Sequence, residues 1–422
     1  MRITAALHLV ALGVSLAPAS SVLAQQKTQP LKLGVETRLV LVDLVVLDKS
    51  DRVVSGLKQG DFVIKEDGKE RPIVSFAAFT GSQPVVAPPV DGPGQASPSA
   101  ASVAAAPQAV GAATVLFVDD NQLTPQDAAR LLPALKKLVD VVAEQEGVLA
   151  LVAPASNLEI ADEPAKNRAA FRAAIDKIVG RRVPDRADLP VSDAEAIAAD
   201  QGDESVIDRL ASRYIYLNPS VNSGMNQIYR LEMAKAMAKS RATEVARDAK
   251  SRREAAYKVL LASLNWLSAG PGRRSIVMVS GGYAADKEDG GMREVVNRSL
   301  RANAPIHFLD ARGLQGMSRL LGAEYREAVE SDGMEATLAF SDESAGAAGL
   351  AADTGGLYIR NTNDMAKGLS RIVDMTGVYY VVGYEPPEHA KPGFRKIKVE
   401  VAKKELKVTA RRGYFDDGVS KP

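Results

Sequence analysis

Short apolar runs alternate with amphipathic segments through the middle of the chain. The runs at 115–118 and 148–152 have the length of buried strands. Between them, residues 125–142 have apolar positions at helical spacing and a proline in the first helical turn, where it is favoured. This alternation predicts an α/β domain with a mostly parallel sheet flanked by helices. The same pattern predicts a helix over 165–178, strands over 275–279, 306–309 and 357–359, and helices over 343–352 and 364–373.

Two other segments, residues 32–80 and the part of the chain after residue 376, have a β pattern instead. In 32–80 we expect strands over 39–47 and 61–65, and Asp67-Gly68 then predicts a hairpin turn with a return strand over 73–79. A three-stranded sheet alone is marginally stable. We therefore expect 32–80 and 378–416 to pack together, or both to dock on the α/β domain. The strands expected after residue 376 are 378–384, 394–401 and 406–410, the last two on either side of a Lys403-Lys404 turn.

Changes in composition mark the boundaries between these parts. Residues 81–112 are rich in Pro, Ala, Ser, Val and Gly and nearly uncharged, as in a linker. Residues 184–268 contain no convincing strand, and a helical pattern runs from about 225 to 267, so we expect a helical insertion in the α/β domain. The predicted organisation is a signal peptide at 1–24, an N-terminal β module at 25–80, the linker at 81–112, the α/β domain at 113–375 with its insertion at 184–268, a C-terminal β segment at 376–416 and a tail at 417–422.

The N-terminus has the pattern of a secretory signal. A basic Arg2 precedes an apolar stretch, and Val22-Leu23-Ala24 supplies small residues before a cleavage point. The stretch is short and is broken by Gly13 and Pro18, which disfavours a membrane anchor. No later segment is long and apolar enough to span a bilayer, so we expect a secreted or periplasmic protein with no transmembrane anchor after cleavage.

Composition limits the chemistry. Without its signal peptide the chain carries 52 basic and 52 acidic residues, so a field that attracts nucleic acid is absent and no nucleic-acid partner is expected. The chain has no cysteine, which excludes disulfides, thiolate catalysis and cysteine-ligated zinc. Two histidines remain: His307 lies in an apolar segment and is expected in the core, and His389 lies in a Pro-rich loop. A Ser-His-Asp triad or a histidine zinc site therefore has little basis.

Two adjacent acids, Asp119 and Asp120, end the strand expected at 115–118. Ligands of open α/β sheets bind at the carboxyl ends of the strands, and hard divalent cations prefer carboxylate and hydroxyl oxygens. The pair therefore indicates a candidate cation site. The alternative is that both carboxylates cap the following helix or turn.

Several segments together resemble one family. They are VETRLVLVDLVVLDKSDRVVSGLKQGDFVIKEDGKE near the N-terminus, PGRRSIVMVSGGY, IHFLDARGL, and VYYVVGYEPP with FRKIKVEV and VTARRGYF near the C-terminus. With them, the chain resembles the exported acidobacterial proteins that contain a von Willebrand factor type A (VWA) domain. The resemblance implies a Rossmann-like fold. It also implies a Mg²⁺-dependent adhesion site built from an Asp-x-Ser-x-Ser loop, a later Thr and an Asp after the fourth strand.

Carried over by residue, this resemblance gives a degenerate site. Asp119 matches the first Asp, but the two serine positions fall on Asn121 and Leu123, and the fourth-strand Asp falls on Gly281. A register shifted by one residue would begin at Asp120 instead. The metal ligands that the resemblance implies are Asp119, Asn121 and Ser280, with Asp120 and Thr124 as alternatives, while Ser220, Asn222 and Ser223 are weak candidates for the later Thr. Mg²⁺ at this site is the single cofactor candidate.

Three functions follow as hypotheses. The first is an exported, non-enzymatic protein-binding or adhesion-type module that uses the carboxyl-end face of the sheet, with an unidentified protein partner. The second is a structural subunit or scaffold of a periplasmic or cell-surface assembly. The third is a hydrolase that uses Asp119 and Asp120, although adjacent residues on a strand point to opposite faces. The residues predicted for the partner-binding face are Asp120, Gln122, Thr124, Tyr283 and Asp310, with Arg312 and Asp286 near the same edge.

Overall fold

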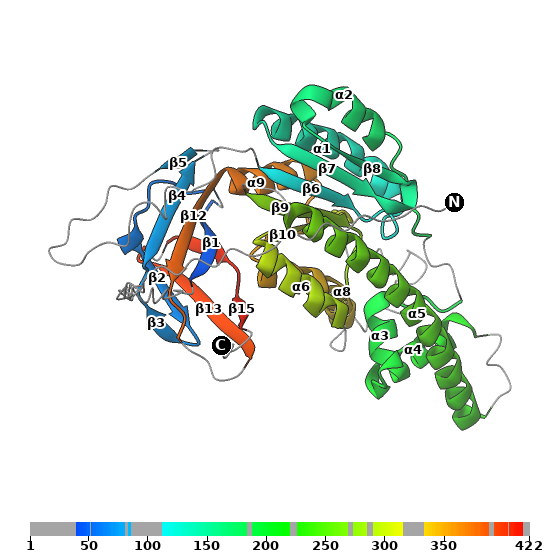
Figure 1. The fold of residues 1–422 in the computed structure, drawn as a ribbon. Helices are drawn as coiled ribbons and strands as arrows, with labels where there is room; N and C mark the ends of the chain where they lie inside the picture. Colours follow the sequence, from blue (N-terminus) through cyan, green and yellow to red (C-terminus); the bar gives the residue numbers. More distant parts are fainter. Residues whose placement is uncertain are drawn as a thin grey trace, which may run out of the picture. The chain divides into compact units, whose positions relative to one another are not determined.

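A six-stranded sheet forms the centre of the α/β part of the computed structural model (Figure 1). Its neighbouring strands run parallel except for the edge pair β7 and β8, so the expected largely parallel sheet is confirmed. The antiparallel edge strand β8 was not predicted from the sequence. In spatial order the strands are β11 (Tyr358–Ile359), β10 (Ile306–Asp310), β9 (Arg274–Ser280), β6 (Ala113–Val118), β7 (Val148–Ala153) and β8 (Leu158–Asp162).

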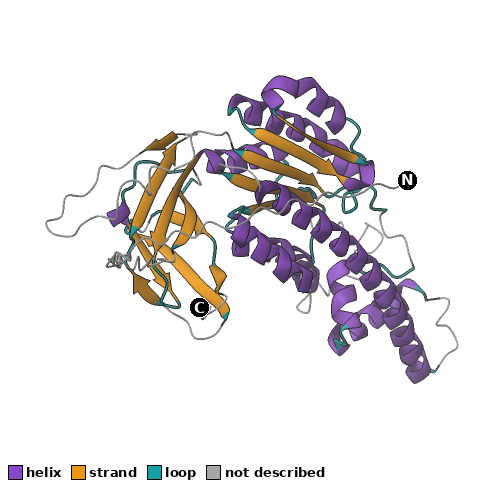
Figure 2. Ribbon diagram, in the orientation of Figure 1, coloured by secondary structure: helices purple, strands orange, loops and turns teal. Residues whose placement is uncertain are grey.

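Helices cover both faces of this sheet (Figure 2). Successive residues of β6 alternate between the two cores, with Leu116 on one side and Phe117 on the other. Burial on both faces explains why the strands are apolar runs rather than alternating ones. One face packs against α1 (Pro125–Glu144), α2 (Pro164–Ile175) and α9 (Met365–Gly377); the other packs against the C-terminal part of α5 (Gln227–Ser268), α6 (Gly290–Ala302) and α8 (Gly333–Thr354). The sequence pattern had not indicated α6.

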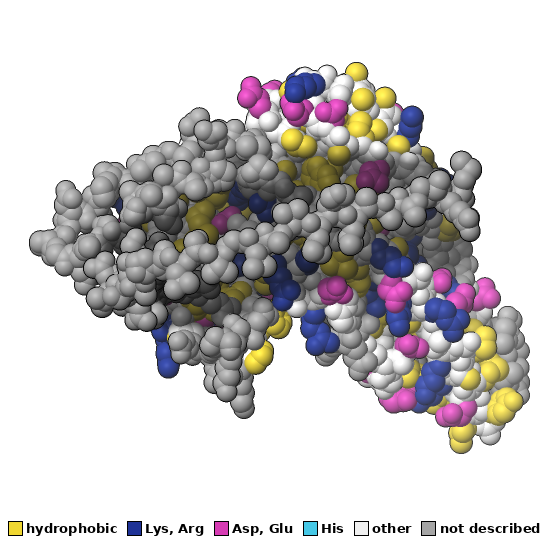
Figure 3. All heavy atoms as spheres, viewed as in Figure 1, with side chains coloured by type: hydrophobic (Ala, Val, Ile, Leu, Met, Phe, Trp, Pro, Cys, Tyr) yellow, Lys and Arg dark blue, Asp and Glu magenta, His cyan; other side chains and the backbone are white. Residues whose placement is uncertain are grey.

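The insertion is helical, as expected, and has a core of its own. It comprises α3 (Asp193–Asp200), α4 (Glu204–Leu217) and the N-terminal part of α5. Alanines at 234, 238 and 242 recur at four-residue spacing, and their small side chains let α5 pack closely on the shorter helices. Basic and acidic side chains are interspersed over these helices in Figure 3, as on a solvated helix surface.

The N- and C-terminal β segments pair with one another in two sheets. β1 (Val40–Leu47) pairs antiparallel with β12 (Val378–Tyr384), and β2 (Phe62–Glu66) pairs antiparallel with β13 (Gly393–Val401). Apolar side chains of both sheets share one core. The sheet orders are β14-β1-β12-β4-β5 and β15-β13-β2-β3, in which the remaining strands are β3 (Lys69–Arg71), β4 (Ser75–Thr80), β5 (Gln83–Val85), β14 (Lys407–Ala410) and β15 (Gly413–Asp416).

Two details of strand pairing differ from the sequence prediction. The turn at Asp67-Gly68 is present, with both residues at positive φ, but its return strand is the short β3. The strand expected to return, at 73–79, is β4, and it pairs with β12 in the other sheet. Likewise β14 pairs with β1 rather than with β13. In both cases the pattern located the strand, but the choice of partner depends on contacts distant in sequence.

The structure describes residues 39–50, 52–80, 83–85, 112–183, 188–219, 226–268, 273–284, 290–314, 333–387, 392–403 and 405–416. The predicted signal peptide, most of the predicted linker and the tail lie outside these residues, as do Ser220, Asn222, Ser223, Asp286 and His389. Within the described parts, none of the helices is both long and apolar enough to cross a membrane.

Candidate functional site

Asp119 and Ser280 meet at the carboxyl ends of two adjacent parallel strands, β6 and β9. The backbone N–H of Asp119 donates to Val279 O at 2.8 Å, which extends the ladder by one residue. The Ser280 hydroxyl then donates to Asp119 Oδ2 at 2.9 Å. Both side chains are buried, with 1% and 0% of their residue surface exposed. The structure therefore brings together two of the three residues predicted as metal ligands.

Burial governs the charge of Asp119. Removal from water raises the pKa of its carboxyl from 3.8 to about 7, and the neighbouring Asp120 carboxylate also raises it. The Ser280 hydrogen bond and the charges of Arg252 and Arg182 lower the pKa, but they do not offset the burial. Asp119 therefore exchanges a proton near neutral pH.

Asp120 points to the other side of β6. Its two carboxylate oxygens accept hydrogen bonds from the backbone N–H groups of Ala155, at 2.9 Å, and Ser156, at 2.7 Å. These N–H groups belong to the 3₁₀ turn η2 (Pro154–Ser156), which follows β7. Asp120 is fully buried and holds the β7–β8 connection in place. The two adjacent carboxylates thus have separate partners, Ser280 at the end of β9 for Asp119 and the turn after β7 for Asp120.

Thr124, rather than either aspartate, caps the helix that follows. Its hydroxyl accepts from Asp127 N at 3.1 Å and donates to Asp127 Oδ2 at 2.7 Å, so it is the N-cap of α1. The expectation that Asp119 and Asp120 cap the following helix is wrong. It failed because three residues, Asn121 to Leu123, separate the pair from the helix and form a turn.

Neither register of the expected metal loop gathers a set of oxygen ligands. In the first register Asn121 is partly exposed, but Leu123 is fully buried in the core. In the second register, Asp120 accepts a hydrogen bond from η2 and Thr124 is hydrogen-bonded to Asp127 of α1. Between them, Gln122 Oε1 accepts from Arg252 Nε at 3.0 Å. The described residues contain no group of three His, Cys, Asp or Glu side chains placed to hold a metal ion. This donor set does not fit Mg²⁺, which requires near-octahedral coordination by oxygens.

Gly281 has a packing reason to lack a side chain. A Cβ atom built on Gly281 would lie 2.1 Å from Gln122 O, a backbone atom of the loop after β6. Aspartate, which the VWA resemblance places here, cannot enter without displacing that loop. The close approach of the two loops therefore requires a glycine at this position.

An ion-pair network connects this edge to the insertion. Arg252 of α5 donates to both carboxylate oxygens of Asp193, at 2.9 and 3.0 Å, in addition to its bond to Gln122. Arg182 also donates to Asp193, at 3.3 Å. Sequence reasoning missed Arg252 and Asp193 because they lie 130 and 71 positions from Gln122 and carry no motif. The only signal was charge on a helix, which is usual for solvated surfaces.

Most of the predicted partner-binding face is buried. Asp120, Gln122, Tyr283 and Asp310 expose 0–3% of their surface, and Thr124 is half-buried. The prediction of a face at these residues is corrected, because their side chains serve internal contacts. Tyr283 packs in the core between Tyr257 and Phe308. Asp310 accepts from Arg312 through both of its carboxylate oxygens, and Arg312 also donates to Ser344.

His307 occupies the core, as expected. It is buried, and its Nδ1 accepts from Leu357 N at 3.1 Å. Burial and the nearby charge of Arg273 lower the pKa of His307 to about 3, so it is neutral at physiological pH.

Comparison with known proteins adds no assignment. No protein-family model matches the chain, and no curated protein matches it.

Proposed function

We propose that this chain is an exported, non-enzymatic protein-binding module of the VWA type, which contacts its partner at the carboxyl-end edge of the six-stranded sheet. The observation that carries the proposal is the meeting of Asp119 and Ser280 between β6 and β9. From β6 the chain proceeds outward to β7 and β8, and then returns to the opposite side of β6 to form β9. Such a reversal of strand order is where open α/β sheets bind their ligands.

The contact surface in this proposal is centred on the loop after β6 and extends over the insertion. Asn121 lies in the turn of that loop and is partly exposed. The hydrogen bond between Gln122 and Arg252 connects the loop to α5. A partner that contacts both the loop and α5 therefore binds a fixed surface. Fixed surfaces lose less conformational entropy on binding than mobile ones.

Partner binding in this proposal does not depend on Mg²⁺. The Asp119 carboxyl already has a hydrogen-bond donor in Ser280 and binds a proton near pH 7. Titration with Mg²⁺ or Mn²⁺ tests this point: a saturable stabilisation that disappears in Asp119→Ala would restore the metal-dependent version.

Site-specific photo-crosslinking tests where the partner binds. A photoreactive residue at Asn121 should capture a protein from the exported fraction of the native cells. The control position is Glu144, an exposed residue at the end of α1, which lies at the opposite, amino-end edge of the sheet. Equal capture at both positions, or capture at Glu144 alone, contradicts the proposal.

A second candidate is a structural subunit or scaffold with a vestigial site. The burial of Asp120, Gln122, Tyr283 and Asp310 favours it, because these side chains hold the loops together. A stoichiometric partner whose affinity is unchanged by Asn121→Arg would support this role. A hydrolytic role for the two aspartates gains no support, since the Asp119 carboxylate is directed to the end of β9 and the Asp120 carboxylate to the turn after β7.

A further inference from the structure

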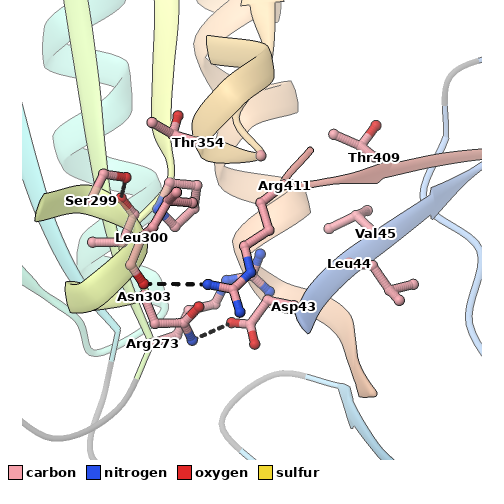
Figure 4. Close-up of a pocket in the computed structure, with 13 residues that line it drawn as sticks. Asp43, Leu44, Val45, Arg273, Ser299, Leu300, Asn303, Thr354, Thr409 and Arg411 are labelled. Carbon is pink, nitrogen blue, oxygen red and sulfur yellow. Dashed lines mark hydrogen bonds between the residues drawn. The ribbon is translucent and has the colours of Figure 1, made fainter. Parts of the chain in front are cut away.

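A pocket lined by two arginines lies between β1, the start of β9 and the ends of α6 and α8 (Figure 4). The pocket is partly open to solvent, and its empty space of about 380 Å³ includes that open side. Arg273 immediately precedes β9, and Arg411 immediately follows β14. The lining also includes Asp43 of β1 and Asn303 after α6.

Both guanidinium groups are held in position. Arg411 donates to two backbone carbonyls, Leu300 O at 3.4 Å and Leu41 O at 2.5 Å. The guanidinium carbon of Arg273 lies 3.8 Å from the centre of the Tyr379 ring, a cation–π arrangement. Since these contacts restrict both side chains, a ligand would not have to order them.

Several donors of this pocket have no acceptor in the described part of the chain. They are Nε and Nη1 of Arg273 and Nε of Arg411, and all three are buried. Nε of the adjacent Arg274 is also buried and has no acceptor among the described residues. A buried donor without a partner destabilises the folded protein, and a charged one does so more strongly. This arrangement favours an acceptor supplied from outside the chain.

The one carboxylate of the pocket does not satisfy these donors. Asp43 Oδ2 accepts from Asn303 Nδ2 at 2.9 Å, and no ion pair joins Asp43 to Arg273 or Arg411 among the described contacts. Burial raises the pKa of Asp43 despite the nearby arginines, and burial lowers the pKa of both Arg273 and Arg411. Two guanidinium groups facing one carboxylate leave the pocket with excess positive charge.

We infer that this pocket is a binding site for a small oxyanion, a carboxylate or a phosphate group, held by Arg273 and Arg411. Guanidinium groups bind both classes through paired N–H···O bonds. The proposal is independent of the proposed partner-binding edge, because the pocket is lined from the amino-end side of β9 and from β1, and Asp119 and Ser280 are not among its residues.

Calorimetric titration of the full-length mature chain with inorganic phosphate, and separately with acetate, tests this inference at constant ionic strength set with chloride. At least one of the two should bind saturably, and the better one identifies the class of oxyanion. Arg411→Gln should weaken binding at least tenfold. The matched control is Arg412→Gln: this neighbouring arginine is exposed, pairs with Asp353 and should retain wild-type affinity.

A second variant keeps the inference testable if Arg411→Gln does not fold. Asp43→Asn keeps an oxygen acceptor for Asn303 but removes the negative charge, so anion binding should become several-fold tighter. The inference is overturned if neither anion binds saturably, if Arg411→Gln and Arg412→Gln bind equally well, or if Asp43→Asn leaves the affinity unchanged or weaker.

Discussion

The hydroxyl of Ser280 donates a 2.9 Å hydrogen bond to the carboxylate of Asp119, although the two residues lie 161 positions apart in the chain. The bond joins the residue that directly follows β6 to the last residue of β9. The strand order of the sheet reverses between these two strands. Both groups are excluded from water, so each depends on the other for a partner.

Removing the hydroxyl should destabilise the protein. Ser280→Ala leaves the Asp119 oxygen without its donor, and we expect the free energy of unfolding to fall by about 1–3 kcal/mol. The pKa of Asp119 should rise further, because the Ser280 hydrogen bond lowers it. Urea denaturation measures the first effect and carbon NMR of the Asp119 carboxyl the second. The control is Ser275→Ala: Ser275 is equally buried, at the other end of β9, and its 3.4 Å contact with Thr114 is weak. An equal loss in both variants contradicts the prediction.

The stability of the protein should depend on pH through Asp119. Its folded-state pKa of about 7 lies above the unfolded value of 3.8, so the folded state binds the proton more tightly. The resulting stabilisation is complete below about pH 4 and is lost as the pH rises through 7, a change of up to roughly 4 kcal/mol. Asp119→Asn, which cannot ionise, should remove this loss and be more stable than the wild type at pH 8.

Melting temperatures at pH 5 and pH 8 check this dependence. The difference between Asp119→Asn and the wild type should grow from the lower to the higher pH. Asp48→Asn is the control, because Asp48 is partly exposed and its hydrogen bonds with Arg52 lower its pKa, so it is ionised at both pH values. A pH dependence that is identical in Asp119→Asn and the wild type would show that Asp119 is ionised throughout.

Gly281 should not accept a side chain. Because a Cβ there meets Gln122 O at 2.1 Å, Gly281→Ala is expected to lower the free energy of unfolding by about 3 kcal/mol. Gly60→Ala serves as the control, since a Cβ at Gly60 meets no atom within 4 Å. Chemical denaturation of both variants distinguishes them. If Gly281→Ala is as stable as the wild type, the loss of the expected aspartate has another cause than packing.

Arg252 should hold the insertion against the sheet edge. Arg252→Gln removes the paired bonds to Asp193, and we expect a local loss of about 1–3 kcal/mol around α3. Hydrogen exchange should become faster in α3 and in the loop after β6, but not in β1 or β12. Lys239→Gln is the control, because Lys239 of the same helix pairs with Glu204 and both side chains are more than half exposed, where such pairs contribute little. Exchange that is unchanged in α3 would contradict this role.

The sequence predicted what depends on local pattern. The run at 115–118, the proline at 125 and the Asp67-Gly68 turn each located an element, because burial and backbone preference act over a few residues. It did not predict strand partners, since β4 and β14 pair with strands far away in the chain.

The candidate site was likewise predicted only in part. Leu123 was correctly taken as no ligand, and Asp119 and Ser280 were expected together because strand ends of a parallel sheet converge. The hydrogen bonds of the Asp120 and Gln122 side chains were not predicted. Their partners, the N–H groups of η2 and Arg252, are fixed by loop geometry and helix packing that no local pattern encodes.

Partner affinity decides whether a protein partner binds at the carboxyl-end edge of the sheet. The partner captured at Asn121 is titrated against the wild type, Asn121→Arg and Glu144→Arg, each with and without a chelator of divalent cations. We expect Asn121→Arg to weaken binding at least tenfold, while Glu144→Arg and the chelator have no effect. Equal affinity of Asn121→Arg and the wild type would contradict binding at this edge.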